Sequence, residues 1–277
     1  MMKKGMGIYV IVFILAFLFP SVVAAEEGEK AKPWERFSLN VGGFIASVNS
    51  DVRIGTQSAG LDISPEDALG LDTSVYVFRA DALWRFTSNR RHCFEMSYYG
   101  LRRESTKTIG GDIQVGDKIY TAGTTLDSSF DVQVIRAAYS YSFVQDDRFN
   151  LAIGGGLYVM PIRIKLSSTS SGETSDEGVT APLPVVGLRF DFAITPKLFL
   201  KESIDVFYFQ YQNFSGGVFD LKVGLEYNIW KHFGVGLAYD YFRLEFKAEG
   251  QDYPYIDLVG KYQFNYGGIL LYGKLFF

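Results

Sequence analysis

The sequence predicts an all-β protein: a transmembrane antiparallel up-and-down β-barrel of about ten strands, preceded by a cleaved signal peptide. Three observations predict this fold. Apolar and polar residues alternate with a period of two in about ten segments. After the N-terminal segment no continuous apolar run approaches about 18 residues, so no transmembrane helix is expected. Short and long connections alternate between the segments, as they do at the two ends of a transmembrane barrel.

The N-terminus has the parts of a secretory signal peptide. Lys3 and Lys4 form its basic end, residues 8–19 its apolar core, and small residues precede a cleavage point expected before Glu26. An uncleaved membrane anchor is the alternative, whereas a lipoprotein anchor is not expected because no cysteine follows the apolar core. We therefore expect a signal peptide over 1–25, a short periplasmic segment over 26–35 and a barrel over 36–277.

The stretch YVFRADALWRF, residues 76–86, shows the alternation most clearly. On a helix, Arg79, Asp81 and Arg85 would point to roughly 0°, 200° and 240°, and no apolar face would survive. On a strand they share one face. Tyrosine and tryptophan gather where hydrocarbon meets headgroups, so the opposite face is predicted to contact lipid. That opposite face carries Tyr76, Phe78, Ala80, Ala82, Trp84 and Phe86.

The same alternation defines the other strands. In the first, the phase slips at Gly42-Gly43, which predicts a bulge. In the fifth, the glycines at 154–156 indicate the close approach of another backbone or a bulky lumen side chain. In the seventh, Glu202 shares parity with lipid-facing residues, and its closeness to a turn predicts an interfacial position. The ten strands are predicted over residues 36–48, 73–87, 92–104, 129–143, 149–166, 181–194, 198–211, 217–230, 233–247 and 255–277.

The strand count depends on residues 255–277. We interpret them as one strand with a bulge at Gly267-Gly268, which gives ten strands; eight or twelve are the alternatives. Short turns are expected in the periplasm and long loops outside, so the mature N-terminus is periplasmic. Within the loop 105–127, apolar residues flank a Gly116-Asp117 turn signal and predict a small hairpin. The short turns are 88–91, 145–148, 195–197 and 231–232, and the longer loops 49–72, 105–127, 167–178 and 248–254, with 213–216 a brief member.

The end of the chain, GGILLYGKLFF, places Ile269, Leu271, Gly273, Leu275 and Phe277 on one face. It resembles the C-terminal strand of Gram-negative outer-membrane proteins, which the barrel-assembly machinery recognises. The stretch FGVGLAYDYFRLEF and the residues after it are similar to small porin-like barrels of the outer membrane. The resemblance implies a Gram-negative outer-membrane location, contact with outer-membrane lipid, and an assembly signal at Leu275 and Phe277.

Parity assigns eight bases and eight acids to the lumen. A channel that selects one ion sign would be expected to carry a ring of that sign. A balanced set favours salt-bridge networks that fill a narrow interior, and ten strands lie near the filled end of barrel sizes. A narrow porin-like channel for small solutes is the alternative. The lumen set is Arg79, Asp81, Arg85, Glu95, Arg136, Arg189, Asp191, Lys201, Asp205, Asp220, Lys222, Glu226, Asp240, Asp257, Lys261 and Lys274.

No catalytic site is expected. The two histidines, His92 and His232, fall in predicted periplasmic turns, away from the long loops. A single cysteine and the lack of a GxGxxG or calcium-loop pattern indicate no metal or cofactor. A net charge of −4 gives no sign of nucleic-acid binding.

The predicted function is therefore a structural or surface-interaction barrel whose outside loops bind an extracellular ligand; an outer-membrane enzyme is the less favoured alternative. The loop acids Asp62, Glu66 and Asp67 are expected to be solvated charges.

Overall fold

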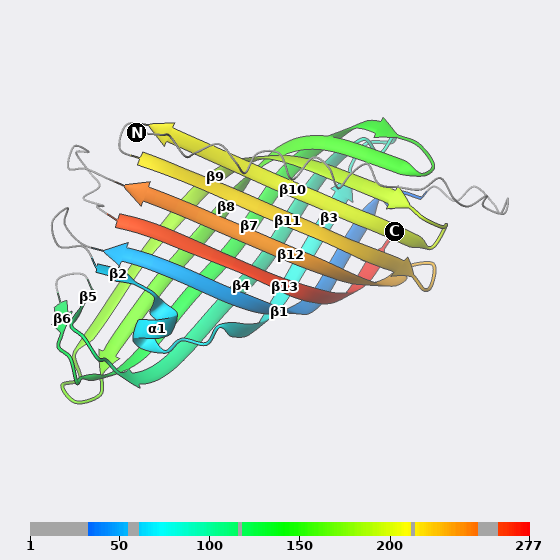
Figure 1. The fold of residues 1–277 in the computed structure, drawn as a ribbon. Helices are drawn as coiled ribbons and strands as arrows, with labels where there is room; N and C mark the ends of the chain where they lie inside the picture. Colours follow the sequence, from blue (N-terminus) through cyan, green and yellow to red (C-terminus); the bar gives the residue numbers. More distant parts are fainter. Residues whose placement is uncertain (1–32, 55–60, 116–117, 212–213, 249–259) are drawn as a thin grey trace, which may run out of the picture. The chain divides into compact units, whose positions relative to one another are not determined.

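Ten antiparallel strands form the barrel wall in the computed structural model, which describes residues 33–54, 61–115, 118–211, 214–248 and 260–277 (Figure 1). The strands are β1 (Phe37–Ile54), β3 (Ser74–Arg85), β4 (His92–Thr108), β7 (Thr125–Gln145), β8 (Phe149–Ser168), β9 (Thr174–Ala193), β10 (Leu198–Tyr211), β11 (Phe214–Asn228), β12 (Phe233–Ala248) and β13 (Gly260–Phe276). Each strand pairs with its neighbour along the chain, and β1 closes the ring by pairing with β13. The predicted ten-stranded up-and-down barrel is confirmed. Residues 1–32, which hold the predicted signal peptide, lie outside the described residues.

Small elements decorate the end of the barrel that carries the long loops. The short strand β2 (Leu61–Ile63) pairs with β1, and β5 (Ile113–Val115) with β6 (Lys118–Tyr120) forms the predicted hairpin. One helical turn, α1 (Pro65–Leu69), begins at Ser64, whose hydroxyl accepts a hydrogen bond from the Asp67 amide. It ends at a left-handed glycine. Among the described residues, no helix is long and apolar enough to cross a membrane.

The strands are longer than a bilayer requires. β7 has 21 residues and β8 has 20, whereas a tilted strand crosses the hydrocarbon in about 9–11. The outer face of β12 shows where the apolar part of the exterior ends: Leu237 and Tyr239 are exposed and apolar, and Arg243, further along the same face, is exposed and charged. The barrel therefore has a half with an apolar exterior next to the short turns and a half with a polar exterior next to the long loops.

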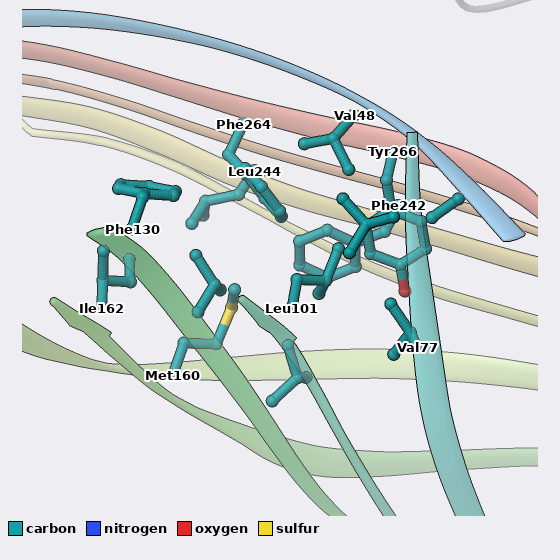
Figure 2. Packing of buried hydrophobic residues seen from close by; sticks show 14 of the residues in the cluster. Val48, Val77, Leu101, Phe130, Met160, Ile162, Phe242, Leu244, Phe264 and Tyr266 are labelled. Carbon is teal, nitrogen blue, oxygen red and sulfur yellow. The ribbon is translucent and has the colours of Figure 1, made fainter. Parts of the chain in front are cut away.

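The inner face changes chemistry at the same level, in the opposite sense. On β12, the inward residue Asp240 is followed by Phe242 and Leu244, all of them buried. Figure 2 shows such side chains reaching inward from strands on different sides of the barrel. We call this packed set the apolar layer: Phe44, Val48, Val77, Tyr99, Leu101, Phe130, Val132, Met160, Ile162, Phe242, Leu244, Phe264 and Tyr266.

This exchange of faces explains why two sequence predictions are wrong. No bulge occurs at Gly42-Gly43, because β1 keeps continuous register with both β3 and β13. Nor does one occur at Gly267-Gly268, where β13 stays in register with β1 and β12. The hydrophobic pattern slips in phase because apolar residues move from the outer to the inner face, as Phe44 does, while the backbone continues unbroken.

The glycines of β8 mark a close approach between strands, as predicted. A Cβ atom on Gly154 would lie 2.1 Å from the carbonyl oxygen of Tyr139 on β7, and one on Gly156 would lie 2.7 Å from that of Ala137. The β7–β8 register shifts nearby, between Ser142 and Val144. Only glycine fits between these backbones.

Candidate functional site

The interior next to the short turns holds charged side chains, and it is the most distinctive chemical feature of the barrel. Placing them in a low-dielectric interior is costly unless each is paired and hydrogen-bonded. We call this set the ionic layer: Glu35, Arg79, Asp81, Arg85, Glu95, Arg136, Arg189, Asp191, Lys201, Asp205, Asp220, Lys222, Glu226, Asp240 and Lys274.

Arg79 joins three strands at the boundary with the apolar layer. Its Nη1 lies 2.6 Å from Asp240 Oδ2, and its Nε lies 3.0 Å from Asp81 Oδ1 on the same strand. Lys222 Nζ on β11 reaches the second oxygen of Asp81 at 3.4 Å. The guanidinium also sits over the ring of Tyr99, 4.7 Å from its centroid. One arginine thus connects the ionic and apolar layers.

A second cluster forms around Glu95 on β4. Arg136 on β7 donates to Glu95 at 2.9 Å and to Asp205 on β10 at 2.6 Å. Arg189 on β9 also pairs with Glu95, and the Ser140 hydroxyl donates to its other oxygen at 3.1 Å. The Glu95 carboxylate thus connects β4 with β7 and β9, and Arg136 extends the cluster to β10.

A third cluster closes the short-turn end. Glu35, just before β1, lies 3.2 Å from Lys274 Nζ, 3.5 Å from Lys201 Nζ and 3.8 Å from Arg85 Nη1. Lys274 also binds Glu226 at 2.6 Å. Asp191 completes the cluster, 3.3 Å from Arg85 Nη2. Strands β3, β10 and β13 thus meet at Glu35, which precedes the barrel, and β9 and β11 join the cluster through Asp191 and Glu226.

Trp34 seals this end. Its side chain is buried, packs against Phe199 and donates from Nε1 to the carbonyl of Asp146 at 2.7 Å. The Trp34 carbonyl in turn accepts a hydrogen bond from Arg90. The residues just before β1 are therefore fastened inside the mouth of the barrel.

Tyrosine hydroxyls complete the network. Tyr158 on β8 lies 2.8 Å from Asp205 Oδ2 and 2.8 Å from Asp220 Oδ2. Tyr272 donates to Glu226 at 2.9 Å. A cavity of about 80 Å³ lies among these groups, room for a few water molecules at about 30 Å³ each in the liquid. Among the described residues, buried side chains of both layers fill the interior around this cavity.

Every predicted lumen residue with a described side chain lies inside the barrel and belongs to the ionic layer. Asp257 and the side chain of Lys261 lie outside the described residues. The sequence prediction missed Trp34 and Glu35, because they precede the first strand and no periodicity marks them. It also missed Tyr158, whose inward parity on β8 was a usable signal.

A gap in the wall lies next to the long loops. β3 pairs with β4 only as far as Arg79 and Tyr99, although β4 continues to pair with β7 up to Thr108. Helix α1 contacts β1 and β4, and its Leu69 is buried in the same hydrophobic cluster as the apolar layer. Lys107 on β4 donates to the carbonyl of Asp67 in the helix. The helix thus adds packing where the β3–β4 ladder is missing.

Glu66 anchors that helix, so its prediction as a solvated charge is wrong. It pairs with Arg103 on β4 and accepts a 2.6 Å hydrogen bond from Ser50 on β1. Burial alone would raise the pKa of the Glu66 carboxyl, but these hydrogen bonds outweigh burial and the pKa is lowered. Asp67 is exposed, and the side chain of Asp62 lies outside the described residues.

On the outer face, Glu202 stands among apolar neighbours. Its cross-strand partners are Phe190 and Val223. At the end of the chain, Leu275 and Phe277 are exposed on the outer face. Phe277 exchanges backbone hydrogen bonds with Phe37. The C-terminus is thereby joined to the beginning of β1.

Each of the two histidines lies within hydrogen-bond distance of one oxygen atom. His92 Nδ1 lies 2.6 Å from the Tyr139 hydroxyl, and His232 Nδ1 lies 3.0 Å from the carbonyl of Phe276. In the part of the chain that is described, no three side chains of His, Cys, Asp or Glu are grouped so that they could hold a metal ion.

Solved outer-membrane barrels share this fold. The outer membrane protease OmpT of Escherichia coli aligns with 87% of this chain and 96% of its own, with a TM-score of 0.57 and 6% identity. The translocator domain of autotransporter NalP from Neisseria meningitidis aligns over 87% and 88%, with a TM-score of 0.46 and 8% identity. No protein-family model and no curated protein sequence matches. The chain has the outer-membrane β-barrel fold, and at such low identity the likeness concerns the fold alone.

Proposed function

We propose that the protein is a sealed barrel of the Gram-negative outer membrane that holds its long loops outside the cell as an interaction surface. The observation that carries this proposal is the filled interior: the ionic layer next to the short turns and the apolar layer beyond it. A continuous solute path would have to disrupt paired charges as well as a packed hydrophobic core. A cavity of about 80 Å³ lies within the ionic layer.

Location and biogenesis follow from the exterior in this proposal. The apolar outer face of the short-turn half contacts outer-membrane lipid, and the polar outer face above it projects from the membrane. The short turns lie in the periplasm. Leu275 and Phe277 are the residues that the barrel-assembly machinery reads, and a cleaved signal peptide directs export.

No reaction is part of this proposal, although OmpT is a protease. The two histidines lie at the short-turn end and bind Tyr139 and a backbone carbonyl. The barrel's contribution is mechanical: it fixes α1 and the β5–β6 hairpin outside the membrane. The occupant of that surface is an extracellular ligand.

Planar-bilayer conductance tests the sealed interior. The wild-type protein is expected to give no steps of current at any salt concentration. The double variant Trp34→Ala/Glu35→Ala, which opens the short-turn mouth only, is expected to stay silent because the apolar layer is intact. Conductance by wild-type protein would overturn the proposal and support the narrow solute channel.

Binding to host surfaces tests the interaction surface. Cells that carry the wild-type protein are compared with cells that carry the Ile119→Asp variant, which changes the exposed hairpin.

A further inference from the structure

The ionic layer contains one acid too many. Its seven bases are Arg79, Arg85, Arg136, Arg189, Lys201, Lys222 and Lys274, and its eight acids are Glu35, Asp81, Glu95, Asp191, Asp205, Asp220, Glu226 and Asp240. An unpaired charge is costly in such an interior. The excess acid therefore needs a counter-charge or a proton.

Asp220 is the acid without an ionic partner. Its side chain is buried on β11, and among the described residues no base lies within ion-pairing distance of it. Each of the other seven acids in the layer pairs with at least one arginine or lysine, as Asp205 does with Arg136. The excess negative charge of the ionic layer is thus located on the carboxyl group of Asp220.

The geometry around Tyr158 indicates how that group is accommodated. The tyrosine oxygen lies 2.8 Å from a carboxyl oxygen of Asp205 and 2.8 Å from one of Asp220. A hydroxyl group has one proton to donate, whereas an ionised carboxylate can only accept. One of the two carboxyl groups must therefore be the donor. Asp205 receives a 2.6 Å hydrogen bond from the Arg136 guanidinium, which favours its ionised form.

We propose that Asp220 is protonated in the folded barrel. Its carboxylic acid group donates a hydrogen bond to the oxygen of Tyr158, and the Tyr158 hydroxyl in turn donates a hydrogen bond to Asp205. Each of the four groups in the chain Asp220, Tyr158, Asp205 and Arg136 then has a hydrogen-bond partner. The ionic layer as a whole is electrically neutral. One bound proton neutralises the excess negative charge of the ionic layer, and no other counter-ion is required. This inference goes beyond the proposed function, since it concerns the charge state of the interior.

The groups that face Asp220 set the direction of its pH dependence. Asp205 and Asp240 disfavour a further negative charge, Arg79 favours it, and the hydroxyls of Tyr158, Tyr99 and Tyr266 complete the surroundings. An aspartate of the unfolded chain is ionised at neutral pH. Because the folded state holds a proton that the unfolded state does not, the free energy of unfolding falls as the pH rises through the range where Asp220 ionises.

Infrared spectroscopy of the protein in lipid vesicles tests this inference, because protonated carboxylic acids have a carbonyl stretch separate from that of carboxylates. Glu202→Gln serves as the background, since Glu202 lies on the apolar outer face. At pH 6 this variant is expected to show one carboxylic acid per chain. The band should disappear in Glu202→Gln/Asp220→Asn and persist in Glu202→Gln/Asp176→Asn, where an exposed acid is changed.

Two outcomes would overturn the inference. Absence of the band in the Glu202→Gln protein at pH 6 would mean that the excess charge is balanced otherwise. In that case a monovalent cation in the cavity is indicated if replacing sodium by choline makes the band appear. Persistence of the band after Asp220→Asn would place the proton on another acid. Should that double variant fail to fold, Tyr158→Phe in the Glu202→Gln background must shift the band, since it removes the hydrogen-bond acceptor of the acid.

Discussion

Arg79 on β3 donates a 2.6 Å hydrogen bond to Asp240 on β12, although β1 and β13 stand between these strands in the sheet. The contact crosses the interior where the ionic layer meets the apolar layer, and both side chains are buried. Pairs of this kind connect strands that are not neighbours in the sheet and hold them at a fixed separation. They fill the described part of the lumen with side chains of the barrel wall itself.

Replacing Arg79 by methionine is expected to lower the free energy of unfolding by about 3–5 kcal/mol, because Asp81 and Asp240 are left buried without their shared partner. Adding Asp240→Asn to Arg79→Met should recover part of the loss. Urea unfolding in detergent, followed by circular dichroism, measures both values. A loss below about 1 kcal/mol, the value typical of exposed pairs, would contradict the account of this contact.

Trp34 is expected to contribute more to stability than a tryptophan on the outside. Trp34→Ala removes a buried ring and the hydrogen bond to Asp146, at a cost of about 3–5 kcal/mol. Trp230→Ala is the matched control, because that ring is 69% exposed. Equal losses of thermal stability in the two variants would show that the mouth of the barrel is not closed by Trp34.

Glu66 is expected to stabilise the barrel in a pH-dependent manner. Its pKa is lowered in the folded state, so its contribution is fully present above the unfolded value of about 4.3 and is lost as the pH falls below it. Glu66→Gln should therefore reduce the melting temperature at pH 7, and the difference from wild type should shrink toward pH 3. Asp67→Asn, at an exposed neighbour, should show no such difference.

Gly154 is expected to tolerate no side chain. A Cβ atom there would lie 2.1 Å from the Tyr139 carbonyl oxygen, so Gly154→Ala should disturb the β7–β8 ladder and reduce the yield of protease-resistant barrel. Gly110→Ala is the control, since nothing lies within 4 Å of its Cβ position. Normal folding of Gly154→Ala would mean that the two backbones are further apart than the structure has them.

The sequence was sufficient for the barrel itself. Alternation in stretches such as residues 76–86 depends on only two surroundings, lipid and lumen, so parity alone sorts Phe78 from Arg79. Strand order needed no further information, because each strand pairs with the next along the chain. The β5–β6 hairpin was equally local in origin.

The apolar layer could not be predicted from a rule that treats every inward position as polar. Next to the long loops the exterior is polar, so the hydrophobic effect drives apolar residues such as Leu244 and Phe264 inward. A strand that crosses both environments must exchange its faces, and a period-two analysis interprets the exchange as a bulge. Glu35 was missed for a different reason: its partner Lys274 is brought near only by closure of the barrel. Glu66 was predicted as a solvated charge because its partner Arg103 lies on a different element, and only the packing of α1 against β4 brings the two together.

Spin labelling of β12 tests the central claim, that lipid covers only the half of the barrel next to the short turns. Single cysteines at Leu237 and Arg243, on a background with Cys93→Ala, carry nitroxide labels in vesicles. We predict that oxygen dissolved in the bilayer enhances the spin relaxation of the label at 237. A water-soluble paramagnet is predicted to enhance the relaxation of the label at 243. Contact of the label at 237 with the water-soluble reagent, or equal exposure of the two labels, would contradict the account.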